Sequence, residues 1–238
     1  MLILYHMEDI IKAYRNVPYF NNKTRGKRAG LRVEIGKGSP KEIMDEVRDR
    51  ALLQKIDLKS FNDEELKKFM VDNNIGIECS GFAFWVLNEE SLRRGKSTLK
   101  GHLKFPFSHG VLGRLRSAIR PIENTDVKTF AHDENSKVVF LSEAQRGDII
   151  TMTSGSERDH ILVINKVEPS IIYYVHAVTW PTDGEYGHGI HEGKIEIINP
   201  EKSIVEQNWV ELGKTGEENY THMRANKSVT ELRRLNWF

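Results

Sequence analysis

The sequence predicts an α+β protein in which helices precede an antiparallel sheet. Apolar residues recur at helical spacing in the first half, up to about residue 119, and β-rich runs joined by short turns follow from about residue 147. Helices first and consecutive strands afterwards favour α+β over an alternating α/β fold. We expect an N-terminal helical extension, residues 1–74, ahead of a main domain, residues 75–238. The alternative is that the two form one compact unit.

Composition limits the partners and the compartment. Charged residues make up 29% of the 238 residues and the formal net charge is +1, so the chain has no overall field for nucleic acid or an anionic membrane. The start is too short and too quickly acidic for a signal peptide, and no apolar run reaches the roughly 18 residues of a membrane helix. We therefore expect a cytoplasmic protein with no membrane partner, with non-classical export as the alternative.

The helical half begins with a predicted hairpin over residues 39–72. Ser39 and Glu42 can form a capping box, and a second apolar stripe starts near Asn62. A further short basic helix is predicted at 111–119, followed by a polar loop at 121–137. Strands are predicted at 149–152, 160–167, 171–179, 194–198 and 203–210, and a short helix at 8–15, while the tail 228–238 fits either a strand or a helix.

The only cysteine, Cys79, lies where a loop turns into an amphipathic helix. Gly76 marks the loop, and Phe82 and Trp85 begin the helical apolar spacing. A thiol in the first helical turn meets unpaired N–H groups and the positive end of the dipole, so we expect the nucleophilic thiolate to be favoured. The alternative is that Cys79 is a small buried hydrophobe. A single cysteine also excludes an intramolecular disulfide and a cysteine-rich zinc site.

Two of the nine histidines, His160 and His176, fall in a predicted strand pair. If the turn is centred on Pro169, paired positions sum to about 338, and the two imidazoles then share one face as diagonal neighbours. An odd sum or a bulge would separate them. One ring could take the thiol proton and the other could fix its tautomer, which predicts a thiol hydrolase.

These residues carry a resemblance to the NlpC-type cell-wall cysteine peptidases of the papain-like superfamily. The matching segments are Glu78-Cys79-Ser80-Gly81, Gly147-Asp148-Ile149, His160-Ile161-Leu162-Val163 and His176-Ala177. The resemblance implies a papain-like fold with Cys79 as nucleophile, His160 as general base and His176 as the orienting third residue. It also implies amide substrates such as the stem peptides of peptidoglycan, and no cofactor. It covers about residues 75–180.

The chain departs from the family pattern at three points. Glu78 replaces an aspartate, Leu162 replaces a small glycine, and the tyrosine that the family carries shortly before the cysteine is missing, with Tyr19 some sixty residues upstream as the nearest substitute. Losing an oxyanion donor costs roughly 10²–10³ in rate. The candidate substrate-binding residues are Tyr19, Ser80, Asp159 and Trp180.

Three other functions are alternatives. The altered positions fit an inactive papain-like module that binds peptide or protein. The loop with Asp183, His188 and His191 resembles a metal site only weakly, so we expect no metal there. Nucleic acid binding through Lys23–Arg32 and Arg114–Arg120 is the weakest alternative.

Overall fold

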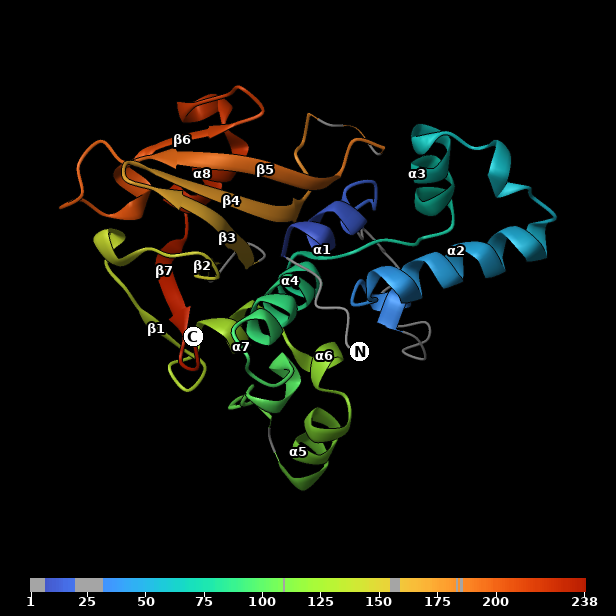
Figure 1. Ribbon diagram of the computed structural model, residues 1–238, viewed down its shortest axis with the longest axis horizontal. Coiled ribbons are helices and arrows are strands. Elements are labelled where there is room, and N and C mark those ends of the chain that lie inside the picture. The colour runs from blue at the N-terminus through green and yellow to red at the C-terminus, as the bar shows by residue number, and fades with distance from the viewer. Residues whose placement is uncertain (1–6, 20–31, 109, 155–158, 183, 185) are drawn as a thin grey trace.

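The computed structural model describes residues 7–19, 32–108, 110–154, 159–182, 184 and 186–238. Within these residues the protein has one seven-stranded antiparallel sheet in the order β1-β7-β2-β3-β4-β5-β6 (Figure 1). The strands are β1 Ser136–Val138, β2 Ile149–Thr153, β3 His160–Glu168, β4 Ile171–Val178, β5 Gly189–Glu196, β6 Asn208–Glu211 and β7 Val229–Leu235. The prediction of helices followed by an antiparallel sheet is confirmed.

The helices lie mostly ahead of the sheet in the sequence. They are α1 Met7–Tyr14, α2 Pro40–Gln54, α3 Asp63–Asp72, α4 Cys79–Arg93, α5 Gly110–Ile119, α6 Pro121–Asn124, α7 Val127–Ala131 and α8 Tyr220–Asn226. The predicted capping box forms at α2, where Ser39 accepts from the Glu42 N–H and Glu42 accepts from the Ser39 N–H. Asn62 caps α3 in the same way, together with Glu65. None of these described helices is long and apolar enough to cross a membrane.

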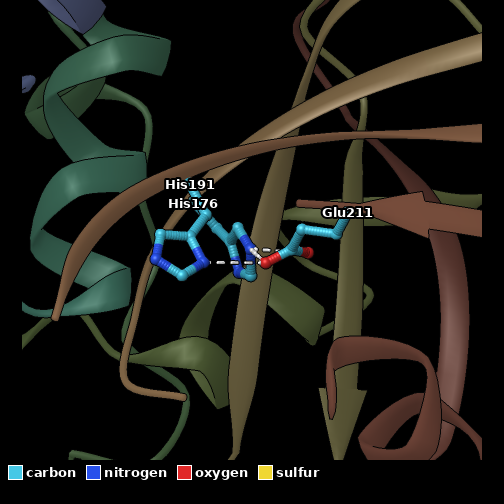
Figure 2. A group of neighbouring side chains, drawn as sticks. All are labelled: His176, His191 and Glu211. Carbon is cyan, nitrogen blue, oxygen red and sulfur yellow. Dashed lines mark hydrogen bonds and ion pairs between the residues drawn. The ribbon is translucent and has the colours of Figure 1, made fainter. Parts of the chain in front are cut away.

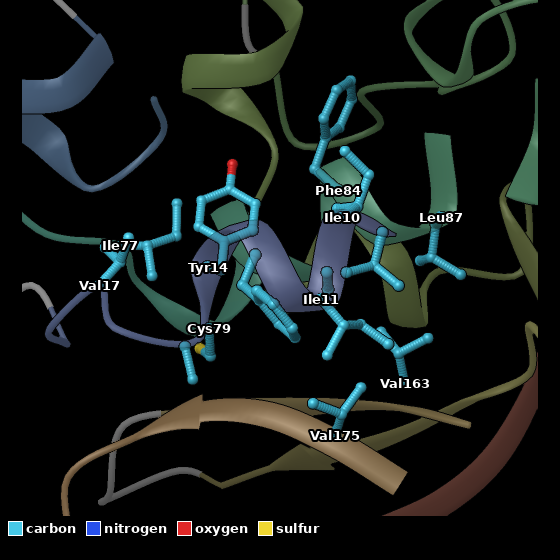
Figure 3. Close-up of a cluster of buried hydrophobic side chains, with 14 of the residues drawn as sticks. Ile10, Ile11, Tyr14, Val17, Ile77, Cys79, Phe84, Leu87, Val163 and Val175 are labelled. Atoms are coloured by element: carbon cyan, nitrogen blue, oxygen red, sulfur yellow. The ribbon is translucent and has the colours of Figure 1, made fainter. Parts of the chain in front are cut away.

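The sheet has a different core on each face. Helix α4 packs on β3 and β4, and α1 packs on α4, so that Ile161 and Val163 of β3 face a core shared with the helical half (Figures 1 and 3). Leu162 and Ile164 alternate to the other face, whose core includes Ala225 of α8. The first core runs from residue 7 to residue 235, so the predicted extension and the sheet domain share it.

The pairing of β3 with β4 contains both irregularities that could have separated the two histidines, namely an odd sum of paired residue numbers and a bulge. At the turn, Glu168 pairs with Ile171, which is an odd sum of 339, and a bulge between Ile164 and Lys166 then restores the even sum of 338 at Val163 and Val175. The one-residue shift at the bulge thus compensates for the odd sum at the turn. His160 and His176 therefore share a face as predicted, by a route that the turn alone does not give.

Other segments differ from the prediction. The polar stretch 121–137 holds α6, α7 and the start of β1, because Asp126 caps α7 with its side chain. The predicted strand at 203–210 is a 3₁₀ turn followed by β6, and β5 starts five residues earlier than predicted. Helix α8 was not predicted, while the tail is the strand β7.

Candidate active site

Cys79 is the first residue of α4 and exposes 6% of its surface. The backbone N–H of Ile161, the residue after His160, lowers the pKa of its thiol. The Ile164 N–H donates to Asp148 O, and Ile164 O accepts from the Gly147 N–H, so the backbone groups of Ile164 face β2. Backbone groups of successive strand residues point to opposite sides, so those of Ile161 face β4. The β3–β4 ladder ends at Val163 and Val175, so Ile161 lies beyond its last paired residues.

A close backbone approach fixes the start of α4. The Glu78 N–H donates to Gly36 O at 3.0 Å, and a Cβ on Gly81 would lie 2.3 Å from that same oxygen. Gly81 of the Cys-Ser-Gly segment is therefore required because any side chain would displace the loop at Gly36. The Trp85 indole N–H donates to Lys37 O at 3.0 Å and secures the same loop.

Next to the thiol lies a buried ion pair. Lys37 Nζ lies 2.5 Å from Glu78 Oε1 and 2.5 Å from Ser80 Oγ, and it also donates to the carbonyl of Thr125. Ser80 Oγ donates to Glu78 Oε1 at 2.9 Å. Lys37 thus ties three segments together behind the cysteine.

These surroundings correct the expectation of a favoured thiolate. Burial and the carboxylate of Glu78 raise the pKa of Cys79 to about 11, although Lys37, Arg224 and the Ile161 N–H each favour the anion. The helix N-terminus does not outweigh desolvation, so the resting form at neutral pH is the thiol.

A chain of hydrogen bonds runs from His160 across three strands. His160 Nε2 lies 2.7 Å from His176 Nδ1, and His176 Nε2 lies 3.2 Å from Glu211. Glu211 also accepts from Tyr174 at 2.7 Å. It accepts from His191 Nδ1 at 3.0 Å as well (Figure 2). These five residues come from β3, β4, β5 and β6, and the three that Figure 2 draws converge on the Glu211 carboxylate.

The carboxylate determines the tautomers along this chain. An ionised Glu211 can only accept, so His176 carries its proton on Nε2 and offers a lone pair at Nδ1. His160 must then donate from Nε2, which leaves the lone pair on its Nδ1. His160 Nδ1 is buried and has no hydrogen-bond partner among the described residues. The network therefore presents one unpartnered basic nitrogen.

Charge states agree with this assignment. Burial, Arg224 and His176 together hold the pKa of His160 well below its ordinary value, and burial lowers the pKa of His176 despite Glu211. Burial opposes ionisation of Glu211, yet His176, His191 and Tyr174 hold its pKa below the usual range. His160 and His176 therefore rest as neutral imidazoles beside the ionised Glu211.

The same cluster is the one group of three potential metal ligands among the described residues. The ligand atoms of His176, His191 and Glu211 lie within 4.8 Å of one another. Two imidazoles and a carboxylate are ligands that zinc takes. Here each already bonds to another member of the group. A metal at His176 Nε2 would displace the proton that His176 donates to Glu211 in the hydrogen-bond chain from His160, which we call the relay.

The structure brings Tyr19 to the cysteine loop. The Ile77 N–H donates to Pro18 O at 3.0 Å and Tyr19 forms a parallel bridge with Ile77, two residues before Cys79. Tyr19 thus lies close to Cys79 in space although it is far away in sequence. Ser80, in contrast, is buried in the Lys37 and Glu78 network.

Asp159 and Trp180 have other partners. The Asp159 carboxylate accepts from the Ser154 N–H at 2.9 Å and lies 3.9 Å from Lys128 Nζ. Trp180 is only 1% exposed, packs against His191 and donates to Thr221 Oγ1 at 3.2 Å. Each therefore supports the walls of the site more than it offers surface to a substrate.

Sequence reasoning missed Lys37, Tyr174 and Glu211. Glu211 could have been found, since it lies two residues after Trp209 in a strand and therefore shares its buried face. Lys37 carries no such signal. The proposed cations of Lys23–Arg32, apart from Arg32, and Asp183 lie outside the described residues.

Comparison with family models, with curated proteins and with solved structures gives no match.

Proposed function

We propose that the protein is a papain-like cysteine hydrolase of amide bonds, with Cys79 as nucleophile and His160 as general base. The observation that carries the proposal is the unpartnered Nδ1 of His160, whose lone pair is set by the chain through His176 to Glu211. The backbone N–H of Ile161 lowers the pKa of Cys79, so the thiol of α4 lies near the β3 residue that follows the base.

The two groups approach the open end of β3 and β4 from opposite faces. Alternation puts His160 on the α8 face with Leu162, and α4 carries Cys79 on the other face. The Ile161 N–H in the sheet lowers the pKa of Cys79, and Arg224 of α8 lowers the pKa of both Cys79 and His160. Both observations support a meeting of thiol and ring at this opening.

The reaction then begins from the neutral pair. As sulfur attacks the carbonyl carbon, a C–S bond forms and the thiol proton passes to His160 Nδ1. The imidazolium returns that proton to the leaving amine when the C–N bond breaks. His160 next takes a proton from water, whose oxygen attacks the thioester carbon. The C–S bond breaks, the acid is released, and the imidazolium returns the proton to the sulfur. N–H groups in the first turn of α4 can stabilise the oxyanion, with Tyr19 as a candidate second donor.

The resemblance to cell-wall peptidases suggests short peptides with γ-linked or D-residue amides, including peptidoglycan stem peptides, as substrates. The test is a panel of such peptides beside all-L peptides, together with an activated ester whose acyl-enzyme is detected by intact mass. The wild type should accumulate one acyl group. Cys79→Ala and His160→Ala should accumulate none, while the control His132→Ala should match the wild type.

A second candidate is an inactive papain-like module that binds peptide or protein. The 6% exposure of Cys79, its raised pKa and the bulky Leu162 favour this alternative. Acylation of Cys79 that depends on His160 would exclude it. Absence of acylation with every substrate, together with saturable peptide binding, would replace the enzyme proposal.

A further inference from the structure

Helix α5, Gly110–Ile119, projects at one end of the molecule, away from the sheet (Figure 1). Its inner side is anchored, since Ser117 is buried and its Oγ lies 2.5 Å from that of Ser108. The helix packs against α6. One side is thus held by the protein and the other faces outward.

The outward side is apolar. Four aliphatic residues are between 54% and 82% exposed, namely Val111, Leu112, Leu115 and Ile119, and Phe107 just before the helix is 52% exposed. At 100° per residue the four aliphatic side chains fall within an arc of about 100°. Such a continuous exposed apolar stripe indicates a contact surface rather than scattered surface residues.

Cations border this stripe on both sides. On the same helical projection Arg114 lies about 60° beyond Val111, and Arg116 lies about 40° beyond Leu112. Both arginines are exposed, and α5 contains no acidic residue. Arg114 also lines a cavity of about 540 Å³ together with Lys100 and Lys104, with Glu134 as its acidic residue.

We propose that α5 docks the protein on an anionic phospholipid surface. Apolar side chains would enter the boundary between headgroups and acyl chains, while the flanking arginines reach lipid phosphates. A second copy of the chain is a less suitable partner, because the arginines of the two copies would repel each other. Nucleic acid is also less suitable, because it would leave the aliphatic stripe exposed to water. The net charge of +1 predicts no membrane partner. That value sums over the whole chain, however, and does not report a local cluster of positive charge such as the one on α5. This proposal does not depend on the enzymatic one.

The test is co-sedimentation of the full chain with vesicles of phosphatidylcholine alone, or with about 30% phosphatidylglycerol. We expect binding to the anionic vesicles only, weakened by high salt. Arg114→Gln/Arg116→Gln should lower the partition coefficient roughly 25-fold, at about fivefold per arginine. Leu112→Gln/Leu115→Gln should lower it at least about tenfold.

Two matched controls share the exposure but lie elsewhere. Leu52 and Leu53 of α2 are each 78% exposed, and Leu52→Gln/Leu53→Gln should bind like the wild type. Lys59→Gln/Lys137→Gln should also retain binding. Circular dichroism checks that each variant is folded. Equal binding to both kinds of vesicle, equal loss in the controls, or self-association or RNA binding that depends on α5 without vesicle binding would overturn the proposal.

Discussion

Breaking the Lys37–Glu78 pair should destabilise the fold and change the reactivity of Cys79 in opposite ways for the two partners. The side chains are 5% and 12% exposed, and Nζ lies 2.5 Å from Oε1. Removing one member of a buried pair costs about 3–5 kcal/mol, because an uncompensated charge stays behind. For a chain of this length, Lys37→Met should then lower the melting temperature by about 6–20 °C.

A double-mutant cycle separates the pair from its surroundings. Lys37→Met and Glu78→Leu should each cost about 3–5 kcal/mol, whereas the double variant should cost no more than Lys37→Met alone. Lys41→Met, at the exposed pair with Asp45, is the control and should stay within about 0.5 kcal/mol. Additive losses in chemical unfolding would refute the reasoning.

The reactivity of the thiol supplies the second readout. Glu78 raises the pKa of Cys79 and Lys37 lowers it. Glu78→Gln should therefore lower the pKa from about 11 and speed alkylation by iodoacetamide near pH 8, in spite of its lower stability. Lys37→Met should slow alkylation. Measurements well below each melting temperature exclude unfolding as the cause, and the same direction of change in both variants would refute the electrostatic assignment.

Further predictions concern Gly81, the relay and the pH dependence. Gly81→Ala should cost about 1–3 kcal/mol in unfolding, because its Cβ would meet Gly36 O at 2.3 Å; an unchanged stability would disprove that close approach. Glu211→Gln should lower kcat/KM for the acyl ester about 10²–10⁴-fold with the fold intact, and full activity would exclude the relay. Zinc should inhibit by taking His176 Nε2, and a chelator should reverse this; activation by zinc would instead support a metal site. The acid limb of kcat/KM should lie below about pH 6.5, since His160 must be neutral and its pKa is lowered, whereas a limb above this value would contradict the assignment.

Local patterns predicted much of the framework. The capping box of Ser39 and Glu42, the helix starting at Cys79 and the strand beginning at His160 all follow from spacing within a few residues. Strand parity also predicted that His160 and His176 share a face, although the bulge at Asn165 shows that the agreement needed two compensating irregularities.

The rest depends on contacts between distant segments. Lys37 reaches Glu78 across 41 positions and Tyr19 bridges to Ile77, and no local pattern reports either contact. The pKa of Cys79 could not be judged from its place in a helix, since burial and the Glu78 charge exceed the effect of the helix end. The sequence predicts a loop over residues 121–137 because α6 and α7 are too short to show a helical period.

The most direct test of the central claim is the alkylation rate of Cys79 against pH in the wild type and in His160→Ala. The chain has one cysteine, so intact mass reports this site alone. With a pKa of about 11, unassisted Cys79 would be about 10⁻⁴ thiolate at pH 7, and roughly 300-fold slower than a free cysteine of pKa about 8.5. We predict that the wild type reacts well above this baseline and that His160→Ala falls to it. Superimposable profiles would mean that sulfur and imidazole do not meet, and would contradict the proposed hydrolase.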